Sequence, residues 1–258
     1  MRRTALIMGM PITVVIPDRE RMEDVGPEAR FATVEEAVRA VFEYFRAADE
    51  RFSPYKPASE TSRIARGEID PAQSSPEMRE VLRLSEETRQ LTGGYFDVWF
   101  KGRFDPSGLV KGWAINKAAG MLDADGFISF SIEAGGDIET RGANEEGLPW
   151  AIGLRNPFEP SKLMRRVLLG NQGIATSGTY IRGEHIYNPR TGAKANALAS
   201  LTVIGPNVYE ADRIATAAFA MGADGIRFIA GLPELDAYSV DWSGTATYTP
   251  GFARHFES

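Results

Sequence analysis

Helix-like and strand-like patterns fall in separate blocks along this chain, and this separation limits the folds open to it. Apolar residues at three- and four-residue spacings predict amphipathic helices over 33–51 and 76–91. Apolar alternation and β-branched runs predict strands at 13–16, 127–132, 150–157, 166–169 and 200–204, with 166–169 pairing toward the stretch that follows it. Neither a GxGxxG nor a Walker A sequence follows any of them. The order of the patterns predicts an α+β fold with largely antiparallel sheets flanked by helices.

Composition narrows the class of protein further. At 258 residues and 43% hydrophobic content, the chain can bury a sizeable core, either as a single domain over 1–258 or as two intimately packed subdomains. Its net charge of −6 argues against nonspecific binding to nucleic acid or to an anionic membrane surface. The absence of cysteine excludes disulfides, thiolate catalysis and cysteine-ligated metals.

The beginning of the sequence reads as a strand rather than as a targeting segment. Two arginines precede an apolar run, but Gly9 and Pro11 interrupt it and a β-branched run follows. No stretch is long and apolar enough to predict a transmembrane helix. The sequence therefore predicts a cytoplasmic protein without a signal peptide or a lipid-bearing cysteine.

The stretch 173–192 concentrates reactive and anion-binding side chains between four glycines. Ile174 and Ala175 predict a short strand that delivers the segment 176–178 to a surface. The run 188–192 has proline at its second position and predicts a type I turn that carries Arg190. His185 lies between these two loops, and histidine titrates near neutrality. A structural histidine beside an ordinary surface turn is the alternative interpretation.

Two further stretches suggest binding of phosphate and of a metal ion. A turn at 104–108 leads into a helix predicted to reach Leu122, whose N-terminus and Lys111 would favour a phosphate. A glycine loop that only caps a helix is the alternative there. In the helix predicted over 207–221, Asp212 and Thr216 stand four residues apart on one face, and oxygen ligands suit magnesium. Packing of the threonine against the preceding turn is the alternative.

Several ordered motifs together resemble those of the ApbE-like flavin transferases, the FAD:protein FMN transferases. They are Met-Gly at 8–9, Gly-x-Phe-Asp at 94–97, Gly-Gly-Asp at 135–137, Ala-Thr-Ser-Gly-x-Tyr at 175–180, His-Ile-x-x-Pro-Arg-Thr-Gly at 185–192 and Ala-Asp-x-x-Ala-Thr-Ala at 211–217. The resemblance implies an ApbE-like, T-fold-like architecture. Two positions depart from the usual pattern, since Asn188 stands where the family has aspartate and Lys111 where some members have glutamate.

The resemblance also implies roles for individual residues. It implies FAD contacts at Met8, Tyr55, Tyr95, Phe96, Asp97, Asp105, Lys111 and Ile186. It implies Mg²⁺ binding by the side chains of Asp212 and Thr216 and by the carbonyls of Gly108 and Ala215. A methionine beside a strand and a tyrosine after a proline also have ordinary structural explanations, as core packing and as a surface anchor.

The expected activity is magnesium-dependent transfer of FMN from FAD to a threonine hydroxyl of an acceptor protein, with release of AMP. His185 is the candidate base for the threonine proton, or organises its transfer, and Arg190 is a charge partner for phosphate or for the loop. Asp97 and Asp137 are less favoured bases. Two alternatives stay open: an FAD pyrophosphatase that gives FMN and AMP, and a noncatalytic FAD-binding protein.

Overall fold

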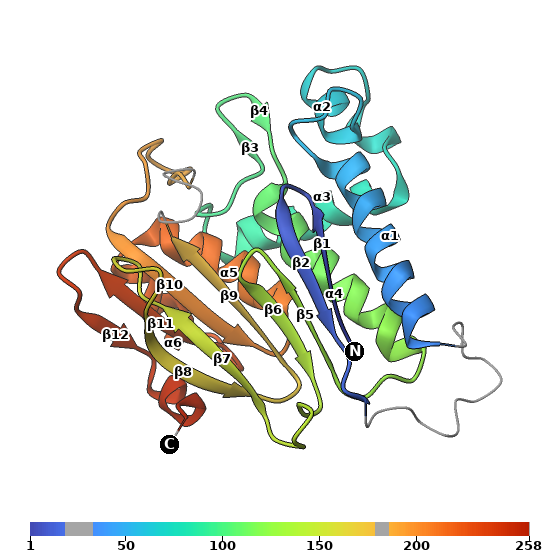
Figure 1. Ribbon diagram of the computed structural model, residues 1–258. Helices are drawn as coiled ribbons and strands as arrows, with labels where there is room; N and C mark the ends of the chain where they lie inside the picture. Colours follow the sequence, from blue (N-terminus) through green and yellow to red (C-terminus); the bar gives the residue numbers. More distant parts are fainter. Residues whose placement is uncertain (19–32, 179–185, 258) are drawn as a thin grey trace.

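A computed structural model describes residues 1–18, 33–178 and 186–257 of the chain. Within them, eight strands form one antiparallel sheet in the order β1-β2-β5-β6-β9-β10-β11-β12 (Figure 1). The strands are β1 (Arg2–Ile7), β2 (Met10–Val15), β5 (Phe130–Ala134), β6 (Asp137–Arg141), β9 (Gln172–Gly178), β10 (Leu198–Gly205), β11 (Asp236–Asp241) and β12 (Ala246–Tyr248). The predicted antiparallel α+β class is confirmed.

Two small hairpins accompany the large sheet. They are formed by β3 (Trp99–Phe100) with β4 (Arg103–Phe104) and by β7 (Trp150–Arg155) with β8 (Leu163–Leu169). The pairing predicted for 166–169 was wrong, because β8 pairs with β7 before it and not with β9 after it. Its Val167 and Leu169 instead pack with Ile174 of β9 as a separate apolar cluster.

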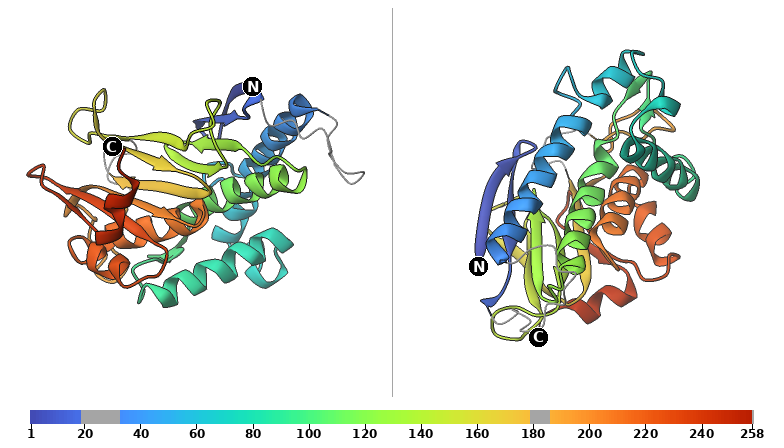
Figure 2. Two further views of the ribbon diagram at one scale, coloured as in Figure 1. Left: turned by 90° about the horizontal axis from the view of Figure 1, so that it is seen from below. Right: turned by 90° about the vertical axis from the view of Figure 1, so that its right-hand side faces the viewer.

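Helices cover one face of the large sheet, as the views in Figures 1 and 2 show. They are α1 (Val34–Phe52), α2 (Glu60–Ala65), α3 (Pro76–Leu91), α4 (Ser107–Ala124), α5 (Val208–Met221) and α6 (Asp224–Ala230), with the 3₁₀ turn η2 (Pro71–Gln73) next to α3. The 3₁₀ turn η3 (Pro250–His255) packs instead against β8 and β11, where Phe252 belongs to the same apolar cluster as Val167. α4 contacts α1, α5 and the strands β5 and β6, which explains why it is apolar on several sides. None of the helices in the described ranges is both long enough and apolar enough to cross a bilayer.

Local signals fix the ends of two predicted helices. Thr33 Oγ1 accepts the backbone N–H of Glu36 at 3.2 Å, which begins α1 as its sequence predicts. Asn207 Oδ1 accepts the N–H of Glu210 at 2.9 Å and begins α5 in the same way. The first turn of each helix thereby gains an acceptor for an otherwise unpaired N–H group.

The N-terminus of α5 is held tightly against the sheet. A side chain at Gly173 of β9 would overlap the backbone of Asn207 and Val208, so only glycine permits this approach. Glu139 of β6 is fully buried, and its Oε2 accepts the N–H of Val208. Because both contacts lie one turn before Asp212, they set where that carboxylate stands.

Candidate active site

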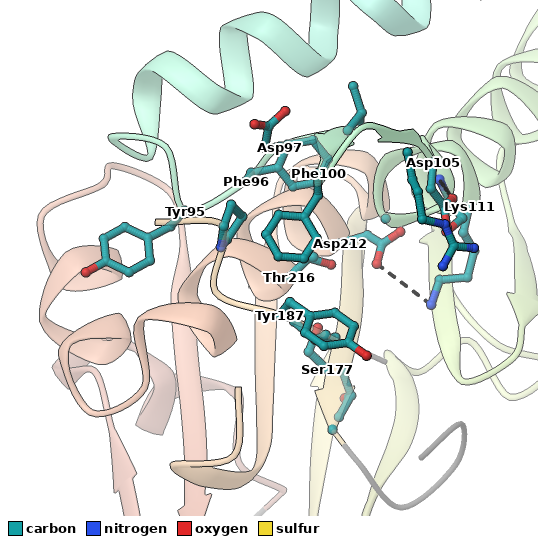
Figure 3. Close-up of a pocket in the computed structure, with 18 of the residues that line it drawn as sticks. Tyr95, Phe96, Asp97, Phe100, Asp105, Lys111, Ser177, Tyr187, Asp212 and Thr216 are labelled. Atoms are coloured by element: carbon teal, nitrogen blue, oxygen red, sulfur yellow. Dashed lines mark hydrogen bonds and ion pairs between the residues drawn. The ribbon is translucent and has the colours of Figure 1, made fainter. Parts of the chain in front are cut away.

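A cavity of about 480 Å³ opens beside the crossing of α4 and α5 (Figure 3). Its walls come from the segment after α3, the first turns of α4, the β5–β6 turn, the end of β9, the segment that begins at Ile186, and α5. The lining residues are Tyr95, Phe96, Asp97, Val98, Phe100, Arg103, Asp105, Ser107, Gly108, Lys111, Gly135, Thr176, Ser177, Gly178, Ile186, Tyr187, Pro189, Asp212 and Thr216. Segments far apart in the sequence therefore converge on one cavity.

Asp212 is held by the backbone of α4. Its Oδ2 accepts the N–H of Gly112 at 2.8 Å, and the residue is 5% exposed. In a regular α-helix that N–H would bond to the carbonyl of Gly108, so Asp212 competes with this carbonyl for its donor. One carboxylate oxygen is thus fixed, while the other, Oδ1, lies 3.7 Å from the ammonium of Lys111.

Lys111 links Asp212 to a second buried acid. Its Nζ forms an ion pair with Oδ2 of Asp137, a residue only 1% exposed at the start of β6. The other oxygen of Asp137 accepts the N–H of Thr176 at 3.1 Å. A buried carboxylate needs a partner of opposite charge, and here the lysine supplies it. This pairing makes Asp137 a counter-ion of Lys111 rather than a free base.

The oxygen atoms at the α4–α5 crossing are of the kind that could hold a magnesium ion. The described residues contain no group of three or more His, Cys, Asp or Glu that could hold a metal. The chain offers instead the carboxylate of Asp212, the hydroxyl of Thr216 one turn later, and the nearby carbonyl of Gly108. Magnesium accepts such a small oxygen set when phosphate oxygens and water complete its coordination.

The structure brings most of the predicted ligand residues into this single cavity. The predicted residues among its walls are Tyr95, Phe96, Asp97, Asp105, Gly108, Lys111, Ile186, Asp212 and Thr216. Ala215 lies beside them, 1% exposed in the apolar cluster between α5 and the sheet. Its predicted role involves only the carbonyl and stays a prediction.

Three predicted residues lie elsewhere or outside the described chain. Met8 packs against the main core, and Tyr55 is 91% exposed in the loop after α1; neither lines the cavity. His185 falls outside the described residues, although Gly178 and Ile186, the described residues on either side of that gap, both line the cavity. The roles predicted for all three stay predictions.

The chain turns at 188–192 as predicted, and the assignment of this turn as type I stays a prediction. The N–H of Gly192 donates to the carbonyl of Asn188 at 2.8 Å, and Asn188 Oδ1 accepts the N–H of Arg190 at 3.0 Å. Asn188 therefore stabilises the turn itself. The Arg190 guanidinium lies 4.9 Å from the ring centroid of Tyr95, in a cation–π contact.

An aromatic pair at the cavity was not predicted from the sequence. The rings of Phe100 and Tyr187 stack with centroids 5.6 Å apart, and Figure 3 shows them one above the other. Phe100 belongs to the β3–β4 hairpin, whose turn consists of Lys101 and Gly102. Both turn residues have positive φ, as in a type I′ turn. The Lys-Gly pair between aromatic residues was the available signal for this hairpin.

Comparison with known proteins agrees with the geometry. A curated FAD:protein FMN transferase from Vibrio cholerae is 32% identical over 130 residues, which cover 46% of this chain and 39% of the relative. One from Escherichia coli is 28% identical over 155 residues, which cover 56% of this chain and 44% of the relative. The aligned part thus spans less than half the length of either relative.

The fold and the family model extend the likeness over nearly the whole chain. A solved flavin transferase ApbE from Vibrio cholerae superposes with a TM-score of 0.83 at 20% identity, over 99% of this chain and 98% of that one, which shows a shared fold. The model of the ApbE family matches residues 8–103 and 98–239. With the fold, the cavity and these matches in agreement, the chain belongs to the ApbE family.

Proposed function

We propose that this protein transfers FMN from FAD to a threonine hydroxyl of an acceptor protein and releases AMP. The observation that carries the proposal is the convergence of Asp212 and Thr216 from α5 with Gly108 and Lys111 from α4 at one cavity. Membership of the ApbE family supports it, as do the relatives named FAD:protein FMN transferase.

The proposed step is a phosphoryl transfer. The threonine oxygen forms a bond to the phosphorus on the flavin side of the FAD diphosphate, and the bond from that phosphorus to the bridging oxygen breaks. AMP leaves with the bridging oxygen, and the hydroxyl proton passes to a base, for which His185 is the candidate. No oxidant or further reactant is needed.

The described residues suit this chemistry by position and by charge. Bound magnesium would supply neutralisation of diphosphate charge, as metal ions do in phosphoryl transfer. Asp212 would hold it, because Gly112 fixes one of its oxygens and the residue lines the cavity together with Thr216 and Gly108. Lys111 would add positive charge near the diphosphate, held in place by its ion pair with buried Asp137.

One experiment separates this activity from the two alternatives. The purified protein is incubated with FAD, Mg²⁺ and a threonine-containing acceptor peptide, and the peptide mass and the free FMN are both measured. A peptide heavier by one FMN unit, accompanied by AMP, is the expected result. FMN and AMP without modified peptide would indicate a pyrophosphatase, and FAD bound but intact would indicate a binding protein.

A further inference from the structure

Two segments far apart in the sequence border the cavity together. Phe100 of the β3–β4 hairpin stacks on Tyr187, and Lys101 Nζ donates to the carbonyl of Gly192 at 3.3 Å. The second segment is a hairpin in its own right, since the N–H of Ala195 donates to the carbonyl of Ile186 at 3.0 Å. Residues 99–104 and 186–195 therefore form one continuous surface beside the cavity, which we call the rim.

The rim is positively charged in a chain that is acidic as a whole. It contains Lys101, Arg103, Arg190 and Lys194 and no carboxylate, whereas the whole chain has a net charge of −6. Within the described residues, Lys101, Arg103 and Arg190 form no ion pair with a carboxylate, although most other arginines and lysines do. Lys101, Arg103 and Arg190 thus carry positive charge on the rim that no described carboxylate neutralises by a direct ion pair.

Two acids next to the β3–β4 hairpin in the sequence each bind a backbone N–H group through one carboxylate oxygen. Asp97 and Asp105 flank the β3–β4 hairpin, but both line the cavity. Asp97 Oδ1 accepts the N–H of Trp99 at 2.8 Å, and Asp105 Oδ1 accepts the N–H of Ser107 at 3.0 Å. One oxygen of each carboxylate is thus bound to a backbone N–H two residues later in the chain.

Aromatic surface accompanies the positive charge. Trp99 is 45% exposed and Tyr187 is 39% exposed, both on the rim. Lys101 stands at the tip of its hairpin with φ of 49°, a left-handed conformation that is unfavourable for a lysine. Exposed aromatic and arginine side chains are enriched at protein interfaces. The composition of the rim is therefore typical of a surface that contacts another polypeptide.

We propose that the rim binds an acidic, extended segment of the acceptor polypeptide next to the threonine that enters the cavity. This inference rests on the proposed function, because a macromolecular substrate that reaches the cavity must touch the residues around it. Lys101 and Arg190 would attract aspartate or glutamate side chains of that segment, and Trp99 would cover its apolar atoms. Complementary charge of this kind speeds association and selects the partner.

The test measures peptide binding directly. Three fluorescein-labelled peptides carry a central threonine flanked by aspartate, by serine or by lysine, and fluorescence anisotropy is recorded with FAD and Mg²⁺ at low salt. We expect the aspartate peptide to bind about 10-fold more tightly than the serine peptide. The variant Lys101→Glu/Arg190→Glu should remove that preference, and Lys101→Gln should reduce it.

A matched control carries the same change of charge elsewhere. Arg46 of α1 and Arg155 of β7 are exposed and form no ion pair within the described chain, so Arg46→Glu/Arg155→Glu should keep the preference for the aspartate peptide. Flavin fluorescence measures FAD affinity in parallel, and Lys101→Glu should leave it within about twofold of the wild type, since Lys101 does not line the cavity.

Three outcomes would overturn the proposal: equal binding of all three peptides, an equal loss in the control variant, or a parallel loss of FAD affinity that assigns these cations to the diphosphate. Because binding is read without catalysis, the two proposals can fail separately. An aspartate peptide that binds through the rim but never receives FMN would contradict the proposed function and leave the rim supported.

Discussion

The backbone N–H of Gly112 donates a hydrogen bond to the Asp212 carboxylate at 2.8 Å, across the crossing of α4 and α5. This bond joins residues 100 positions apart and places the only carboxylate proposed as a metal ligand. Because Gly112 has no side chain, the backbones of α4 and α5 approach each other closely there. The position of Asp212 therefore depends on the glycine of another helix.

Replacing Gly112 with alanine should damage both stability and the proposed metal site. The new Cβ would lie 2.7 Å from Asp212 Cβ and 2.9 Å from the carbonyl oxygen of Val208, so the helices must separate. We expect a loss of about 1–3 kcal/mol in the free energy of unfolding, measured in urea. Gly120→Ala in the same helix meets nothing within 4 Å and should instead stabilise by about 0.5–1 kcal/mol. Equal effects of the two substitutions would refute this explanation.

The variant Asp212→Asn should remove the negative charge of this side chain and keep its hydrogen bond to Gly112. The asparagine oxygen can still accept the N–H of Gly112, so the fold should persist, but the negative charge beside Lys111 is lost. We expect Mg²⁺ affinity to fall at least about 10- to 100-fold, measured by titration calorimetry with FAD present. Asp224→Asn, at the exposed start of α6, is the control and should bind Mg²⁺ normally. Unchanged affinity in Asp212→Asn would remove Asp212 from the metal site.

Glu139 should prove essential for holding α5. Burial raises the pKa of this carboxyl, although the neighbouring Arg141 guanidinium opposes the rise. Glu139→Ala would leave the N–H of Val208 without its buried acceptor and Arg141 with only Asp123 as ion-pair partner, and we expect a loss of about 3 kcal/mol in urea denaturation. Glu139→Gln keeps an acceptor for Val208 and should lose clearly less. A glutamine variant as unstable as the alanine variant would contradict this role.

The stability of the protein should fall on mild acidification because of His255. Burial lowers the pKa of this imidazole from its usual 6.5, against the opposing effect of Asp236, whose Oδ2 lies 3.3 Å from Nε2. The unfolded chain therefore binds a proton at pH values where the folded chain does not, and folding weakens as the pH falls below about 6.5. His255→Gln should flatten this part of the curve of melting temperature against pH. An unchanged slope would show that other groups cause it.

Local sequence was sufficient for several elements. The apolar spacing and the Thr33 cap predicted α1, the residues 76–91 predicted α3 with its observed bounds, and Asn207 marked the start of α5. The strand predicted at 127–132 begins later, at Phe130, and Ile128 is largely exposed in the preceding segment. Alternation alone could not tell loop from strand there, because both can carry an apolar residue.

The sequence by itself determined the kind of elements, the motifs and which residues could bind phosphate or metal, because helix periodicity, capping and turn chemistry act over a few neighbouring residues. Only the tertiary structure decided that Lys111 pairs with Asp137, that Phe100 stacks on Tyr187, and that Gly112 holds Asp212. These contacts join residues that are tens of positions apart, and no local pattern in the chain specifies which distant backbone or side chain will be within reach.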